Sequence, residues 1–188
     1  MASEIDIYNI TLNFLGADQI MDAGQNSENA QILQSLYATT RDAVLRAHPW
    51  NCALTRAQLA VMAVAPAWGY TAQFQLPADP YCLRVHRLED DALPFVVEGR
   101  RILCDAAGPL NILYVARVTD AEQYDALLLQ TIAARLAYAG GYRITNNPDM
   151  TANSWKWYGE LLQEARSIDG QEGAPEDMGA GDFLGVRY

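Results

Sequence analysis

Basic residues are scarce in this chain. Of its 188 residues, 13 are Lys or Arg and 23 are Asp or Glu, so the formal net charge is −10 with His neutral. Nonspecific binding of nucleic acid needs a basic face that neutralises phosphates, and an anionic membrane surface repels an acidic protein. The charge balance therefore argues against proteins that grip nucleic acid or lie on a membrane.

Cysteines and long apolar runs are also scarce. Cys52, Cys82 and Cys104 are too few and too scattered for a disulfide framework, and an odd number leaves one unpaired, which favours free thiols in a reducing compartment. The N-terminus carries acid where a signal peptide carries base. The most apolar stretch, residues 59–68, contains Pro66 and is well short of the ~20 residues of a membrane span. We therefore expect an intracellular protein without a membrane segment.

The sequence lacks the signatures of catalysis. His48 and Cys52 stand four residues apart, but Pro49 ends a helix at this point, so the spacing does not imply a thiol–imidazole pair. None of the 23 acidic residues stands out by context as one of a catalytic pair. We predict that the protein is not an enzyme; a small cysteine- or carboxylate-dependent hydrolase is the alternative.

Metal and cofactor motifs are missing as well. Cys82 and His86 fall on the same face of an expected strand, without the paired ligands typical of zinc sites. The acidic run 89–91 lacks the spaced ligands of a calcium loop, and the glycines of 179–185 lack the dinucleotide-binding spacing. We predict neither a metal nor a cofactor.

The hydrophobic pattern changes period twice along the chain, and 51% of the residues are hydrophobic, which supports a sizeable core. Apolar residues at helical spacing predict helices over about 4–15, 28–47, 120–139 and 150–168. The first three of these helices are expected to begin at Ser3, at Ser27 and at a capping box over 119–122. Gly140 and Gly141 are expected to interrupt the third helix.

Between residues 51 and 118 the pattern favours five or six short antiparallel strands. Alternation over 70–76 places Tyr70, Ala72, Phe74 and Leu76 on a buried face, with Thr71, Gln73 and Gln75 opposite. The other strands are expected over 51–64, 82–88, 95–97, 101–104 and 110–118, with 98–100 as a hairpin turn.

This order of elements predicts an α+β fold: an antiparallel helical bundle with an inserted antiparallel β-sheet and an extended C-terminal tail. Residues 1–50 and 119–168 are expected to form the two halves of the bundle. Residues 51–118 are expected to form the sheet region, and 169–188 the tail.

Two helices suggest contacts with other subunits. The third helix is apolar nearly all round, so we expect it to be buried on several sides, either centrally in a bundle or partly against another subunit. In the fourth, Trp155, Tyr158, Leu162 and Ala165 form the expected inner face, and Trp157, two residues from Trp155, cannot share it. Trp157 is therefore a candidate interface residue, the alternative being that it covers a loop.

The tail changes composition again. Residues 169–188 hold five glycines, five acidic residues and one arginine, which cannot bury a core, yet the last six are apolar and aromatic. We expect this segment to be extended and to dock on a partner. The alternative is that it packs back on its own domain. The candidate docking residues are Phe183, Leu184, Val186 and Tyr188.

Several strings in order along residues 12–169 resemble the tail tubular protein A family, the head-to-tail adaptors of tailed, mainly short-tailed, phages. The most specific is HPWN at 48–51, the end of the string RDAVLRAHPWN at 41–51. The match departs at 79–82, where two residues are inserted between the LPAD and CLRV strings. The other strings are RAQLA at 56–60, GY at 69–70, LPAD at 76–79, CLRV at 82–85, ILYVARVTD at 112–120, AARLA at 133–137 and EARSID at 164–169.

The resemblance implies a structural virion protein without catalytic residues. Such adaptors form a ring, usually of twelve copies, that binds the portal protein and the tail nozzle or tail tube protein at the head–tail junction. They assemble in the host cytoplasm and leave a channel through which DNA passes without specific binding. An acidic lining fits such a channel because it repels phosphate and lets the genome slide. An assembly factor absent from the mature particle is a further alternative.

Overall fold

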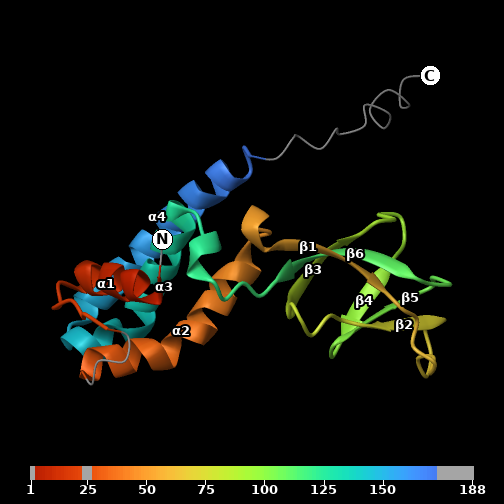
Figure 1. Ribbon diagram of the computed structural model, residues 1–188, viewed down its shortest axis with the longest axis horizontal. Coiled ribbons are helices and arrows are strands. Elements are labelled where there is room, and N and C mark those ends of the chain that lie inside the picture. The colour runs from red at the N-terminus through yellow and green to blue at the C-terminus, as the bar shows by residue number, and fades with distance from the viewer. Residues whose placement is uncertain (1–2, 23–26, 173–188) are drawn as a thin grey trace.

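The computed structural model describes residues 3–22 and 27–172. Its helices gather in one unit, at the left of Figure 1, and its strands in a second unit at the right. Helices α1 (Glu4–Leu15) and α2 (Glu28–Ala47) precede the six strands, and α3 (Ala126–Thr145) and α4 (Pro148–Asp169) follow them. The predicted α+β fold, a helical bundle with inserted antiparallel strands, is confirmed. The part of the expected tail from residue 173 onward lies outside the described residues.

The first two helices begin and end where the sequence predicts. Ser3 caps α1 in a capping box with Asp6: the backbone N–H of Asp6 donates to Ser3 Oγ, and that of Ser3 to Asp6 Oδ2. Ser27 caps α2 by accepting from the N–H of Ala30. The 3.6-residue pattern and the caps agree here, so local signals suffice to define both helices.

The start of α3 differs from the prediction. Asp120 caps only a short 3-10 helix, Ala121–Gln123. The α-helix begins after Asp125, whose Oδ1 accepts from the N–H groups of Leu127 at 2.7 Å and Leu128 at 2.9 Å. A side chain that satisfies two orphan N–H groups is a strong N-cap, so the helix begins six residues later than expected.

The prediction that Gly140 and Gly141 interrupt α3 is wrong, because the helix continues to Thr145. Both glycines are buried where α1 and α2 pack on α3. A Cβ on Gly141 would lie 3.1 Å from Leu15 Cδ2, and one on Gly140 would lie 3.4 Å from Ile32 Cγ2. The pair therefore serves close helix packing, which compensates for its poor helix propensity.

The third helix is the centre of the helical unit, as its apolar composition predicts. It packs against α1, α2 and α4, and its inner residues are fully buried. Thr11 of α1 donates its hydroxyl to the carbonyls of Ile7 and Ala133, so the polar group at this crossing is satisfied. The fully buried residues at the centre include Ile7, Leu12, Leu33, Leu128, Ile132 and Leu136.

The strands form two small antiparallel sheets where the sequence predicts one. The first has the order β1 (Leu54–Leu59), β6 (Leu110–Ala116), β3 (Cys82–Leu88), and the second β2 (Ala72–Gln75), β5 (Arg101–Cys104), β4 (Phe95–Glu98). Each sheet has one apolar face, and apolar residues of both pack in one cluster that includes Phe74, Ile102, Ile112 and Tyr114.

Three expected strands are shorter than predicted: the strands expected over 51–64, 70–76 and 110–118 cover only Leu54–Leu59, Ala72–Gln75 and Leu110–Ala116. Residues 51–53 form a 3-10 turn, and β1 ends at Leu59 because its partner β6 starts at Leu110, the residue that Leu59 faces. Beyond it, Val61 makes a single bridge with Phe74. Gln73, expected on the polar face of its strand, is buried because the loop before β2 covers it; its Nε2 donates to the Val64 carbonyl at 2.6 Å.

Candidate functional site

The helical unit exposes a group of aromatic side chains around one arginine. The Arg135 guanidinium carbon lies 4.8 Å from the ring centre of Trp155, 5.1 Å from that of Tyr158 and 5.5 Å from that of Tyr138. Tyr142 follows Tyr138 one turn later on α3 and is more than half exposed. We call Arg135, Tyr138, Tyr142, Trp155 and Tyr158 the aromatic face.

The composition of the aromatic face is that of a protein contact site. Trp155 is 48% exposed, and its ring lies 4.8 Å from that of Tyr138 and 5.4 Å from that of Tyr158. Trp, Tyr and Arg are the residues most enriched at interface hot spots. Stacking on Arg135 holds the rings in place before a partner arrives, which lowers the entropy cost of binding.

Part of this face is visible in the sequence. Positions 135, 138 and 142 have helical spacing, as do 155 and 158. The prediction that α3 is buried on several sides is right for most of the helix. It does not account for the exposed stripe that contains Tyr138 and Tyr142. The pairing of the two stripes depends on how α3 packs against α4, which periodicity does not specify.

The orientation of α4 corrects the expected roles of its tryptophans. Trp155, predicted on the inner face, is the exposed one. The ring of Trp157, the predicted interface residue, lies 5.6 Å from that of Phe14 in α1 and is part-buried. Ser154 and Ala165 are the buried positions of the helix in this region. The helix is therefore rotated from the predicted orientation, so that Ser154 takes the inner position expected for Trp155.

The end of α4 is fixed to the end of α2 and to the 3-10 turn that precedes β1. Asp169 Oδ1 accepts from the N–H of Asn51 at 3.0 Å, and Asp169 Oδ2 lies 3.0 Å from His48 Nε2. Arg166 donates to the carbonyl of Ala47 at 2.6 Å. Asp169 is itself buried, so the boundary of the tail at 169 is wrong: Asp169 belongs to the helical unit.

The candidate thiol–imidazole pair does not have the environment of a nucleophile. His48 is paired with Asp169, and burial lowers the pKa of its imidazole while Asp169 opposes this shift. Burial, with smaller contributions from Asp125 and Asp169, raises the pKa of the Cys52 thiol to about 11. A thiol that stays protonated at neutral pH is a poor nucleophile.

Thiol reactivity tests this conclusion. Burial also raises the pKa values of Cys82 and Cys104, which lie inside the strand unit. The native protein should react with Ellman's reagent at pH 8 on the order of 100-fold more slowly than free cysteine, because few thiolates form and access is poor. After unfolding in guanidinium, all three thiols should react at once. A native thiol that reacts as fast as free cysteine would support the hydrolase alternative instead.

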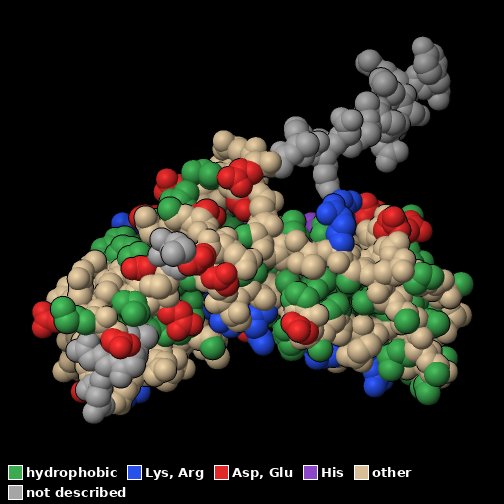
Figure 2. All heavy atoms as spheres, in the orientation of Figure 1, with side chains coloured by type: hydrophobic (Ala, Val, Ile, Leu, Met, Phe, Trp, Pro, Cys, Tyr) green, Lys and Arg blue, Asp and Glu red, His purple; other side chains and the backbone are tan. Residues whose placement is uncertain are grey.

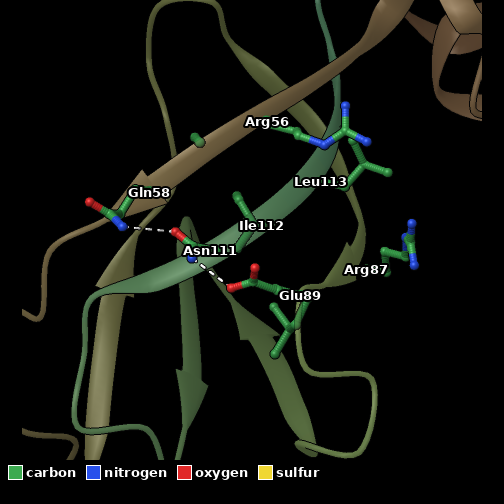
Figure 3. A pocket seen from close by; sticks show the side chains of 9 residues that line it. Arg56, Gln58, Arg87, Glu89, Asn111, Ile112 and Leu113 are labelled. Carbon is green, nitrogen blue, oxygen red and sulfur yellow. Dashed lines mark hydrogen bonds between the residues drawn. The ribbon is translucent and has the colours of Figure 1, made fainter.

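A shallow hollow lies on the outer face of the first sheet (Figure 3). It has a volume of about 460 Å³, with Arg56 and Arg87 at its edge. Gln58 donates to Asn111 Oδ1 at 3.0 Å, and Asn111 donates to Glu89 Oε2 at 2.6 Å. Glu89 is the carboxylate among the lining residues and has a hydrogen-bond donor, so the hollow offers no carboxylate pair for acid–base chemistry.

The sequence-level metal candidates are not brought together. Two bulges interrupt the alternation of β3, so Cys82 is buried and His86 exposed, rather than both lying on one face as predicted. In the acidic run, Asp90 accepts from the N–H of Ala92 and Asp91 lies 3.6 Å from Arg87. Within residues 3–22 and 27–172, no group of three or more His, Cys, Asp or Glu side chains could hold a metal ion.

In comparisons with known proteins, no family model and no curated protein matches this chain. Among the described residues, no helix combines the length and the apolar character that crossing a membrane requires.

Proposed function

We propose that this chain is a structural subunit of a tailed-phage particle. About twelve copies form a ring at the head–tail junction, joining the portal protein to the tail nozzle or tail tube protein and leaving a channel for DNA. The observation that carries the proposal is the aromatic face, a preorganised contact surface on the helical unit. The strings that resemble head-to-tail adaptors support it independently.

The aromatic face suits the contact between neighbours in a ring. Each subunit of a ring uses two different surfaces, one for each neighbour, so a surface rich in hot-spot residues on one side of the helical unit can serve one of them. Helical units would then pack side by side, with the strand units beyond them. The net charge of −10 suits passage of DNA, since an acidic channel repels phosphate and does not retain the genome.

The segment after α4 serves attachment in this proposal. Asp169 is buried and paired, and the N–H groups of Gly170, Gln171 and Glu172 donate to carbonyls at the end of α4, so the helical unit extends to Glu172. Its docking residues, Phe183, Leu184, Val186 and Tyr188, lie outside the described residues and remain a prediction. The segment would reach a neighbouring component of the particle from a fixed root at the junction of the two units.

The proposal predicts that Trp155→Ala weakens the ring. Particles made with this variant should contain at least ~10-fold fewer copies of the chain per portal, because a hot-spot tryptophan contributes about 2 kcal/mol or more to a contact. The Lys156→Ala variant is the matched control: Lys156 is the next residue of α4, and its side chain is 74% exposed. Quantitative mass spectrometry of purified particles measures both.

Two results would count against the proposal. Equal copy numbers for Trp155→Ala and Lys156→Ala would remove the aromatic face from the ring contact. If particles with the natural chain contain none of it, the protein is an assembly factor instead.

A further inference from the structure

A basic groove runs between α2 and the strand unit, in a chain that is acidic overall. Its volume is about 750 Å³. Figure 2 shows basic side chains, coloured blue, near the place where the two units meet. We call it the basic groove. Its charged and aromatic lining includes Asp42, Arg46, Tyr81, Arg84, Arg100 and Arg117.

Two arginines of the groove enclose one aromatic ring. The guanidinium carbon of Arg100 lies 3.8 Å from the ring centre of Tyr81, and that of Arg117 lies 4.2 Å from it. Arg100 also donates to the carbonyls of Pro77 and Cys82, at 2.5 and 3.1 Å. The side chains are therefore held in one arrangement before anything binds, and preorganised groups lose less entropy on binding.

Positive charge in the groove exceeds negative charge. Among the described residues that line it, four are arginines and one, Asp42, is acidic. Asp42 is shared: its Oδ2 lies 2.7 Å from Arg117 Nη2, and its Oδ1 lies 2.8 Å from Arg41 Nη2. Arg46, one helical turn after Asp42 on α2, donates to the carbonyl of Leu83. Backbone carbonyls accept these bonds without neutralising the charge.

Arg84 adds to this excess. Its Nε is buried and has no hydrogen-bond partner within residues 3–22 and 27–172. Burial, followed by the nearby charges of Arg46 and Arg166, lowers its pKa. A buried donor without a partner costs free energy. A carboxylate that binds here would supply an acceptor and would reduce the repulsion between Arg84 and the neighbouring arginines.

Apolar side chains share the same groove. Leu83, Val85, Phe95 and Val97 line it beside the arginines, and Val97 is 45% exposed. The groove therefore fits a segment that carries carboxylates together with apolar side chains, rather than a small inorganic anion.

We infer that the basic groove receives residues 172–188 of a second copy of this chain. The segment has the complementary composition: Glu172, Glu176, Asp177 and Asp182 precede Phe183 and the other apolar residues of the tip. Each copy thus carries both a segment of complementary composition and a groove, which is the arrangement of a head-to-tail contact that closes into a ring. The choice of a second copy rests on the proposed ring.

The length of the segment supports a neighbour as the acceptor. Twelve residues separate Gly170 from Phe183, and they span up to ~40 Å when extended. An extended segment of that length can cross to a neighbouring subunit. The tether would raise the concentration of the tip at the neighbouring groove.

Binding of a peptide to the isolated protein tests the inference without requiring a ring. The probe is a fluorescein-labelled peptide of residues 172–188, titrated with the full-length chain at low concentration and followed by fluorescence anisotropy. Arg100→Glu should weaken binding at least ~10-fold, since it replaces a charge-assisted bond with repulsion, and added salt should weaken it as well. Arg101→Glu is the matched control, because Arg101 bonds Gln73 away from the groove.

A second peptide tests the same charge requirement on the natural chain, so the result does not depend on the folding of the Arg100→Glu variant. It carries Glu176→Gln, Asp177→Asn and Asp182→Asn, and it should bind the natural chain at least ~10-fold more weakly than the natural peptide. Failure of the natural peptide to bind, or equal binding of both peptides, would overturn the inference. If the peptide does not bind but particles contain the chain, only the groove inference fails and the ring proposal stands. If the peptide binds but particles contain no copy of the chain, only the ring proposal fails.

Discussion

Replacing Trp50 with alanine should lower the free energy of unfolding by about 3–5 kcal/mol, the range for a large aromatic side chain in a core. Trp50 is fully buried and lies where the chain passes from α2 to β1. Its Nε1–H donates to the carbonyl of Val44 at 3.0 Å. Its ring packs edge-on against that of His48, with 4.7 Å between the ring centres. The substitution removes packing and leaves a buried carbonyl without its donor.

The matched control is Trp68→Ala. Trp68 is 86% exposed, in the loop between β1 and β2, so its removal should change the free energy of unfolding by no more than about 0.5 kcal/mol. Urea denaturation followed by circular dichroism measures both variants. A loss below 1 kcal/mol for Trp50→Ala, or equal losses for the two variants, would contradict the assignment of Trp50 to the hydrophobic core.

Ending the chain after Gly170 should abolish attachment to the particle while leaving the fold intact. The truncated chain keeps Asp169, so the contacts of α4 with His48 and Asn51 remain. Ordering a backbone residue costs ~1–2 kcal/mol, so an isolated subunit has little reason to fix the missing segment. On a partner, each apolar side chain of the tip that becomes buried contributes ~1.5–3 kcal/mol, which offsets the ordering of the tip.

Thermal unfolding of the truncated chain and the yield of infectious particles made with it measure the two halves of this prediction. The melting curve should match that of the full chain, and infectious particles should not form. Asp169→Ala is the control for the anchor, because it should lower thermal stability by breaking the bonds to His48 and Asn51. Infectious particles from the truncated chain, or a collapse of its stability, would show that the segment belongs to its own core.

The parts of the fold that the sequence predicts correctly depend on local signals. The bounds of α1 and α2 agree with prediction because Ser3 and Ser27 cap their starts. Gly16 adopts the left-handed conformation after α1, with φ 64°, and the His48–Pro49 pair ends α2. The hairpin of β4 and β5 is likewise local, since Glu98 faces Arg101 across a two-residue turn.

The features that were missed depend on contacts between distant segments. The glycine pair of α3 looks like a break until Leu15 and Ile32 are seen to pack against it. The division of six strands into two sheets depends on pairing across long loops. The basic groove joins Arg46 of α2 to Arg100 and Arg117, which no spacing rule connects. Sequence patterns report one element at a time, so such sites emerge only from tertiary packing.

Single-particle imaging of purified particles tests directly whether the chain forms a ring at the head–tail junction. We expect a ring of about twelve copies between the portal and the tail, into which the helical unit of each subunit fits with Trp155 at the contact between neighbours. Particles whose head–tail junction contains no copy of this chain would refute the proposed function.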